Sequence, residues 1–306
     1  LINQKLKKFI KSYLDNKKCM IGSSHFLNMR PKYNKYMHLN DFDYKIYSQN
    51  GEDGIIDYLL HSLSIKKPKF AEIGVGDYSE CNTRYIFEST SPKGLIIDCI
   101  KDFREKVKKN VKLWKGDLLV LEKIVTPENF IEILKKHDFS NNLDLFSIDI
   151  DGLDYWVLKK VPENFSKIIV VEYNAVFGEH LEISVPNIEN FERTNYHYSN
   201  LCFGASLKAI VKLMRSKNYV FIGTNLTRVN AFFVAKNQIS NLNINIPDEK
   251  DLKDHVDSNI RESRNQKSKL TYISGKKKLE LIKECNVINL KNNELISIKK
   301  LLDESI

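Results

Sequence analysis

The 306-residue sequence predicts an α/β fold built on a mostly parallel sheet with helices on both faces. Four short apolar segments support this prediction, because each is rich in Ile, Val, Leu or Phe and each ends in an acidic residue. Continuous apolar runs of this length are typical of parallel strands that are buried on both faces. Helical patterns alternate with them, as in βαβ units with right-handed crossovers. The four segments are 70–77, 94–98, 143–149 and 168–172.

The region before the first strand predicts two helices. Apolar residues three to four positions apart indicate a short helix over 3–15. The polar stretch that follows predicts a loop up to Asp43. Apolar spacing from Asp53 onward predicts an amphipathic helix, which a polar turn at 48–52 precedes.

Strands and helices alternate through the rest of the central region. The strands should end at Glu72, Asp98, near Asp117 (from a strand over 114–118), at Asp149 to Asp151, and at Glu172. Thr126-Pro127-Glu128 has the cap, proline and early acid of a helix start. Further helices are expected at 80–89, at 102–110, up to Val161 and at 205–217, and closing strands at 219–224 and 231–235.

Composition narrows the class of protein. With 42% hydrophobic and 28% charged residues, the chain has the composition of an ordinary globular protein. No run approaches the roughly 18 to 20 apolar residues that span a bilayer, so we expect no membrane span. The five cysteines are odd in number and form no C-x-x-C pair. This argues against a disulfide or cysteine–metal framework and favours a reducing cytoplasmic location.

The net charge of +9 is concentrated at the two ends of the chain. Residues 1–40 carry nine Lys or Arg against one Asp, and residues 266–306 carry nine against five acidic residues. The part between them is therefore slightly acidic, which argues against a nucleic-acid groove there. The predicted organisation is a basic helical extension over 1–45, a central domain over 46–240 and a basic extension over 241–306.

A glycine turn follows the first strand, in the pattern Glu72-x-Gly74-x-Gly76. Glycines at a strand-to-helix turn let the backbone approach a ligand closely. A dinucleotide enzyme would carry a third glycine where this chain has Ser79, and the preceding acid would repel phosphate. A carboxylate here favours the positively charged methionyl end of S-adenosylmethionine, and a plain αβ turn is the alternative.

Acidic residues at the next two strand ends extend this site. Asp98 stands where a carboxylate accepts hydrogen bonds from both ribose hydroxyls of a nucleoside. Asp117 is a candidate for contact with the adenine amino group. For each of them, an ordinary surface aspartate is the alternative.

Three carboxylates occur within six residues at the end of the fourth strand, in Asp149-Ile150-Asp151-Gly152-Leu153-Asp154. Like charges this close either raise a pKa or hold a divalent cation such as Mg²⁺ or Mn²⁺. We expect Asp149, Asp151 and Glu172 to form that metal site. The alternative is that Asp154 caps the next helix and that Asp151 is solvated.

Candidate acid–base residues follow the fifth strand, on the side where an acceptor would enter. His180 and His197 are candidate general bases, and Asn174 is a further candidate catalytic residue beside Asp149. Each histidine is otherwise a surface or packed residue. In the turn before the first αβ unit, Gln49, Asn50 and Glu52 are candidate cofactor contacts, with a helix cap as the alternative.

Taken together, these segments resemble the FkbM-like family of S-adenosylmethionine-dependent methyltransferases. The resemblance covers about three-fifths of the chain and leaves both basic extensions outside. The matching segments are S-Q-N-G-E-D-G-I (48–55), E-I-G-V-G-D-Y-S-E-C-N-T (72–83), S-I-D-I-D-G-L-D-Y-W-V (147–157), V-V-E-Y-N (170–174), F-G-A-S-L (203–207) and N-A-F-F-V (230–234).

The resemblance implies a class I methyltransferase sheet of seven strands with the last one antiparallel. It implies cofactor contacts at Glu72, Gly74, Gly76 and Asp98, with the turn at 49–52 closing over the methionine end. It also implies O-methylation of a sugar or a nucleotide-activated sugar, for bacterial surface polysaccharide such as capsule or for a glycosylated metabolite. An RNA methyltransferase, a non-catalytic scaffold and a homo-oligomer stay open as alternatives.

Overall fold

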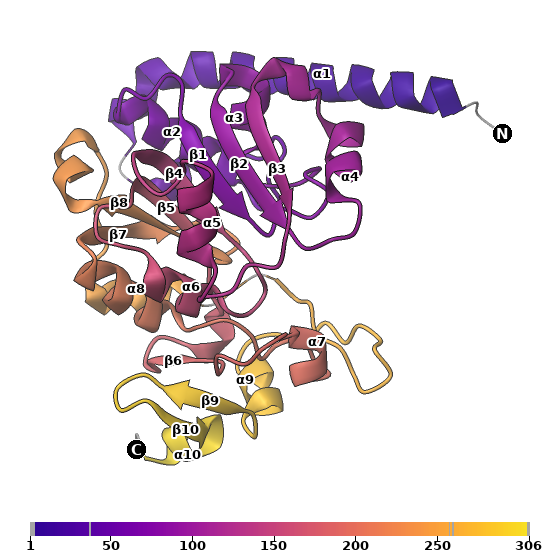
Figure 1. Ribbon diagram of the computed structural model, residues 1–306. Coiled ribbons are helices and arrows are strands. Elements are labelled where there is room, and N and C mark those ends of the chain that lie inside the picture. Colours follow the sequence, from indigo (N-terminus) through magenta and orange to yellow (C-terminus); the bar gives the residue numbers. More distant parts are fainter. Residues whose placement is uncertain (1–3, 37, 257, 259, 305–306) are drawn as a thin grey trace.

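The computed structural model describes residues 4–36, 38–256, 258 and 260–304, which fold around a seven-stranded sheet (Figure 1). The strand order is β3-β2-β1-β4-β5-β8-β7, and β8 is antiparallel to both of its neighbours. The predicted fold class is confirmed, including an antiparallel strand, β8, as the last strand of this sheet along the chain. The strands are β1 (Lys69–Ile73), β2 (Lys93–Asp98), β3 (Asp117–Glu122), β4 (Leu143–Ile148), β5 (Ser166–Glu172), β7 (Tyr219–Thr224) and β8 (Asn230–Ala235).

Helices cover both faces of the sheet because its strands are apolar on both sides. In β1, Phe70 packs into one core, and Ala71 and Ile73 pack into the other. One core includes α5 (Phe130–Lys136), α6 (Asp154–Lys160) and α8 (Leu207–Ser216). The other includes α2 (Glu52–Ser62), α3 (Arg84–Thr90) and α4 (Phe103–Asn110).

The strand register brings the acidic strand ends to one edge of the sheet. Ile73 of β1 pairs with Ile97 of β2 and with Ile148 of β4, and Ile148 pairs with Val171 of β5. The residues at or next to these positions, 72, 98, 149 and 172, therefore share the carboxyl edge. That edge is where open α/β sheets bind their ligands.

The third strand differs from the prediction. The apolar run at 118–121 forms β3, whereas residues 113–115 form a 3-10 helix on which Trp114 is 81% exposed. Asp117 therefore starts the strand and pairs with Lys93, at the amino edge of the sheet. The predicted adenine contact by Asp117 is wrong, because the residue lies at the far end of its strand from Asp98.

Two helix boundaries also differ from the prediction. Thr126 and Asn129 exchange side-chain and backbone hydrogen bonds that close a turn, so α5 begins only at Phe130. The first helix, α1 (Gln4–Met29), runs through most of the expected loop. Its second half packs on the protein: Gly22 lies so close to Ile46 that a Cβ there would overlap it.

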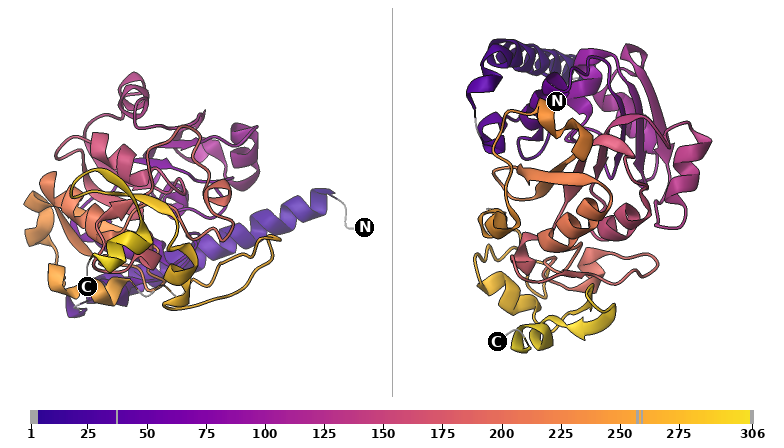
Figure 2. Two further views of the ribbon diagram at one scale, coloured as in Figure 1. Left: turned by 90° about the horizontal axis from the view of Figure 1, so that it is seen from below. Right: turned by 90° about the vertical axis from the view of Figure 1, so that its left-hand side faces the viewer.

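The C-terminal part of the chain folds back onto the central region as a small second layer (Figures 1 and 2). The strands β9 (Asn286–Asn289) and β10 (Glu294–Ser297) form a three-stranded sheet with β6 (Ile183–Ser184). The remaining α-helices are α7 (Arg193–Tyr196), α9 (Lys277–Ile282) and α10 (Ile298–Asp303). Short 3-10 helices lie at Arg30–Lys35, Leu39–Phe42, Leu113–Lys115, Ala175–Phe177, Lys236–Asn241 and Glu249–His255. Among the described residues, no helix combines the length and apolar character needed to cross a membrane.

Candidate functional site

A cleft of about 1320 Å³ runs along the carboxyl edge of the sheet. This volume exceeds the roughly 300 to 1,000 Å³ of a typical site for one small ligand. Most of the predicted site residues line it: Gln49, Asn50, Glu52, Glu72, Gly74, Gly76, Asp98, Asp149, Asp151, Glu172 and Asn174. Asp117, His180 and His197 are not among the described residues that line it.

The glycine turn and Asp98 form one rigid unit in the cleft. One Asp98 oxygen, Oδ2, accepts hydrogen bonds from the backbone N–H groups of Val75 (2.9 Å) and Gly76 (2.8 Å). Its other oxygen, Oδ1, accepts from the N–H of Ile100 at 3.0 Å. Gly74 has φ +77° and Gly76 has φ +56°, a region that favours glycine. The loop is thus held open by the same carboxylate that was expected to face a ribose.

Glu72 is buried beneath this loop and is occupied by protein donors. Its Oε1 accepts from the N–H of Asn82 (2.8 Å), and its Oε2 accepts from the N–H (2.9 Å) and hydroxyl (2.5 Å) of Thr83. Burial raises the pKa of Glu72 to about 7, although these hydrogen bonds lower it. Glu72 therefore fixes the segment before α3, a positioning role that the sequence pattern did not reveal.

Hydrogen bonds to the side chain of Asp53 hold the turn at 48–52 in place. Asp53 Oδ2 accepts from the backbone N–H groups of Ile46, Tyr47 and Ser48 and from the Ser48 hydroxyl. Burial raises the pKa of Asp53 to about 6. Because Asp53 and Ser48 hold the loop, the side chains at 49, 50 and 52 can face the cleft.

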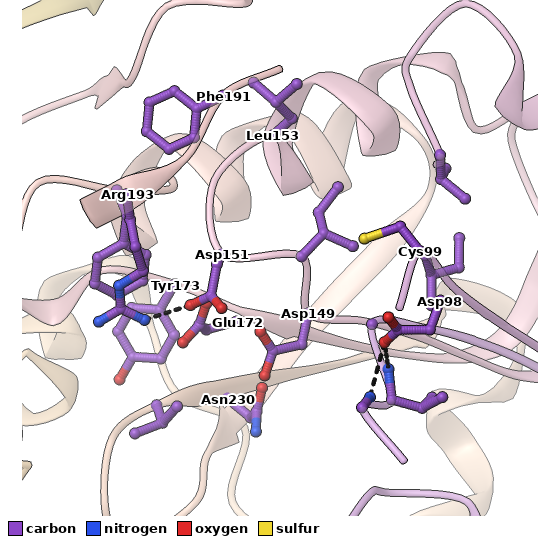
Figure 3. Close-up of a pocket in the computed structure, with 18 of the residues that line it drawn as sticks. Asp98, Cys99, Asp149, Asp151, Leu153, Glu172, Tyr173, Phe191, Arg193 and Asn230 are labelled. Carbon is purple, nitrogen blue, oxygen red and sulfur yellow. Dashed lines mark hydrogen bonds and ion pairs between the residues drawn. The ribbon is translucent and has the colours of Figure 1, made fainter. Parts of the chain in front are cut away.

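Glu52 connects this turn to the opposite side of the cleft. Its Oε1 accepts from the side-chain amides of Asn225 and Asn230, both at 2.7 Å. The amide oxygen of Asn230 is thereby turned away from Glu52, and Figure 3 shows the Asn230 side chain pointing toward Asp149.

Three carboxylates gather at the centre of the cleft (Figure 3). Asp149, Asp151 and Glu172 each offer one oxygen, and these oxygens lie within 4.8 Å of one another. Two nearby oxygens, Glu172 Oε2 and Asn230 Oδ1, are buried and have no hydrogen-bond partner among the described residues. Arg193 forms an ion pair with Asp151 at the rim.

Burial and crowding favour the protonated forms of Asp149 and Glu172 when no cation is bound. Burial, and then the charges of Asp151 and Asp154, raise the pKa of Asp149 to about 8. Burial, and then the charge of Asp149, raise the pKa of Glu172 well above its usual value, and Arg193 opposes this. Asp154 accepts from the N–H groups of Ile150 and Gly152 and thus holds the turn before α6; the helix cap proposed for it is wrong, because Leu153 is the N-cap and makes no side-chain cap bond.

The remaining predicted catalytic residues lie elsewhere or are already engaged. Asn174 donates its amide hydrogens to the carbonyls of Leu201 and Phe203, and its oxygen accepts from the N–H of Val176. It therefore braces the cleft wall. His197 lies outside the cleft with Nδ1 2.7 Å from the Ser199 hydroxyl, and burial lowers its pKa.

His180 is also outside the cleft. Its side chain is 85% exposed and lies beside Glu179. Neither His180 nor His197 is among the described residues that line the cleft, so this geometry gives no support to the predicted general-base role of either histidine.

Several cleft residues were missed by the sequence analysis. Arg193 follows a loop without a regular pattern, and its guanidinium stacks on Phe203 at 4.1 Å from the ring centroid. Asn230 is a buried polar residue in an otherwise apolar strand, and this departure from the pattern was the one sequence feature that could have identified it as a site residue. Phe191, Cys99 and the segment 123–129 complete the walls.

No protein-family model matches the sequence, and no curated protein is significantly similar to it. Solved structures with a similar arrangement are distant. The S-adenosylhomocysteine-bound methyltransferase PaMTH1 of Podospora anserina is 12% identical, with a TM-score of 0.41 over 77% of this chain and 97% of that one. An O-methyltransferase family protein of Burkholderia thailandensis is 10% identical, with a TM-score of 0.36 over 60% of this chain and 58% of that one. Spermidine synthase of Thermotoga maritima is 12% identical, with a TM-score of 0.34 over 79% and 71%.

The sheet itself has the strand order of the class I methyltransferase fold. One fold of this kind hosts many chemistries, so activity and substrate depend on the side chains in the cleft.

Proposed function

We propose that this protein is an S-adenosylmethionine-dependent O-methyltransferase whose acceptor is a sugar or a nucleotide-activated sugar. The observation that carries the proposal is the placement of two different sites in one cleft. A glycine loop fixed by Asp98 lies at one end, and the group Asp149, Asp151 and Glu172 lies beside it. The first suits a nucleoside cofactor, and the second suits a hydroxyl that has to lose a proton.

The residues present fit S-adenosylmethionine. Asp98 accepts three backbone N–H bonds, which leaves one lone-pair site, on Oδ1, for a ribose hydroxyl, and the space beside Gly76 is open. Gln49 and Asn50 also line the cleft. When bound, the cofactor would supply an electrophilic methyl group on a positively charged sulfur.

The carboxylate group also fits a divalent cation such as Mg²⁺. Hard cations take oxygen ligands, and Asp149, Asp151 and Glu172 supply three within reach of one another. Two buried oxygens without a partner, on Glu172 and Asn230, are the atoms that such an ion would satisfy. When bound, the ion would polarise an acceptor hydroxyl and lower its pKa.

The chain's own residues then have defined tasks. Asp149 lies between the glycine loop and Glu172, so it can accept the hydroxyl proton as the oxygen attacks in line. Its pKa, raised to about 8 while no cation is bound, would be lowered by a bound Mg²⁺, which would leave Asp149 ionised near neutral pH. Arg193 forms an ion pair with Asp151, and its guanidinium stacks on the ring of Phe203. Together the cation and the ring would form a surface on which the acceptor can bind. The resemblance to the FkbM-like family supports a sugar as the acceptor.

A methyl-transfer screen with the purified chain tests the activity. Sugar nucleotides serve as acceptors with Mg²⁺ present, and binding of S-adenosylhomocysteine is measured by calorimetry. Asp149→Asn should lower turnover at least about 100-fold while cofactor affinity changes only a few-fold.

Asp144→Asn is the matched control, since Asp144 lies near the other end of β4 and binds Lys167 and the N–H of Lys69. Its turnover should stay near that of the parent. No binding of S-adenosylhomocysteine would refute the proposal. Full activity after removal of divalent cations would contradict the proposed metal site, but the proposed methyltransferase activity would stand. If RNA is methylated and no sugar is, the proposal of a sugar acceptor is wrong and RNA is the acceptor.

A further inference from the structure

The outer face of α1 is apolar over most of its length, although it faces away from the protein. The inner face is marked by Asp15, Gly22 and Phe26, which recur at helical spacing and contact the rest of the molecule. On the opposite side lies what we term the outer stripe, whose side chains are 41–68% exposed. Its residues are Leu6, Phe9, Ile10, Tyr13, Leu14, Met20 and Ile21.

This stripe is unusual for a surface helix. Isolated exposed apolar residues are ordinary, but seven large ones on one side of a single helix, interrupted by Lys17, mark an interaction surface. The amino-terminal half of α1 also extends beyond the body of the protein (Figures 1 and 2). A flat partner can therefore approach it without meeting the rest of the fold.

The charges around the stripe are positive. Residues 4–29 contain six lysines and one aspartate. Asp15, the aspartate, is paired with Arg84 on the inner side. Lys17 lies over the ring of Tyr13, within the stripe itself.

A second basic segment lies beside the helix. Lys11 donates to Asn110 at the end of α4, which brings the two helices together. The exposed residues of α4 and the loop after it include Arg104, Lys108, Lys109 and Lys112. Because Lys11 precedes Asp15 by four residues and shares its inner face, these cations lie beside α1 on the side of the protein and do not border the outer stripe.

We propose that the outer stripe of α1 attaches this protein to a bilayer surface rich in anionic lipids. An amphipathic helix with lysines and large apolar residues lies in the interface, with its apolar side among the acyl chains. Anionic headgroups then meet the flanking lysines. A second copy of this chain is a poorer occupant, because pairing two α1 helices would bring their lysines together.

Vesicle flotation with the full chain tests the attachment. The chain should bind vesicles of about one-third phosphatidylserine at least tenfold more strongly than phosphatidylcholine vesicles, and about 0.5 M NaCl should remove most of that difference. Leu14→Ser should weaken binding at least about fivefold, because each buried apolar side chain contributes to partitioning. Lys17→Glu should weaken binding only to the anionic vesicles.

Leu295→Ser is the matched control, since Leu295 is 57% exposed, Leu14 is 58% exposed, and Leu295 lies on β10 in the C-terminal layer. It should bind like the parent, and unfolding midpoints should be equal for both variants because neither side chain is buried. Equal binding to both kinds of vesicle, or no effect of Leu14→Ser, overturns the proposal. So does a lipid-free dimer that Leu14→Ser dissociates, because the stripe would then belong to a second copy. Methyl transfer is not the readout, so this result is independent of the proposed function.

Discussion

The backbone carbonyl of Asp149 lies directly against the α-carbon of Gly74, and a Cβ added to Gly74 would come within 1.6 Å of its oxygen. The turn after β1 and the turn after β4 therefore fit together only if residue 74 is glycine. This contact joins the glycine turn after β1 to the turn that carries Asp149.

Gly74→Ala should accordingly disrupt both ends of the cleft. The new methyl group forces the two backbones apart, at a residue whose φ of +77° already disfavours alanine. We expect the free energy of unfolding to fall by about 3 kcal/mol and the affinity for S-adenosylhomocysteine to fall at least tenfold. Gly275→Ala is the control: φ is +60° and no atom lies within 4 Å, so only about 1 kcal/mol and no affinity should be lost. Equal effects of the two would refute the role of the contact.

The buried carboxyl of Glu72 should make stability depend on pH. Its pKa is raised from 4.5 to about 7, so the folded chain binds a proton that the unfolded chain releases. That contribution is fully present below about pH 4.5 and is lost as the pH rises through 7. The free energy of unfolding of the parent relative to Glu72→Gln should fall by about 2 kcal/mol from pH 5 to pH 8.

Urea titrations at the two pH values measure this difference. Glu122→Gln provides the comparison, because Glu122 also ends a strand and accepts from one N–H, that of Phe103. If the difference in the free energy of unfolding between the parent and Glu72→Gln is the same at both pH values, the pKa of Glu72 is not raised.

Replacing the two histidines should leave catalysis nearly intact. His197 and His180 lie outside the cleft, so His197→Asn and His180→Ala should keep turnover within about threefold of the parent. Steady-state kinetics on the best acceptor from the screen measures this. A loss of about 100-fold in either variant would restore a histidine base and displace Asp149 from that role.

Arg193 should determine the acceptor affinity. Lysine cannot reproduce its contacts, since the guanidinium bonds Asp151, donates twice to the carbonyl of Asn200 and stacks on Phe203. Arg193→Lys should raise the KM for the acceptor about tenfold and leave the Kd of S-adenosylhomocysteine unchanged. Arg104→Lys, at an exposed position of α4 that does not line the cleft, is the control and should change neither value. A change confined to the cofactor Kd would assign Arg193 to the other end of the cleft.

The sequence was sufficient for the sheet and for most of the residues at its edge. Parallel strands buried on both faces leave a strong local signal, and a shared edge follows from their direction. Asp117 shows the limit of this reasoning. Only three residues separate the apolar run at 118–121 from Leu113 and Trp114, and tertiary packing decides which part pairs with β2.

The functional side chains outside the strands were harder to foresee. Glu72, Asp98 and Asn174 were identified as site residues, but their hydrogen-bond partners lie in loops whose path has no local pattern. Arg193 reaches Asp151 across 42 residues of sequence. Contacts of that kind depend on how a long segment folds back, which residue spacing does not encode.

The pairing of β6 with β9 affects the order in which the protein matures during synthesis. Ile183 pairs with Asn289, so that layer can form only after residue 289 has left the ribosome. Strands β1 to β5, at whose carboxyl edge the cleft lies, are complete by residue 172. Ser258, Ile260 and Lys278, which also line the cleft, are translated long afterwards. In a nascent chain the wall that these three residues form would therefore be the last part of the cleft to be completed.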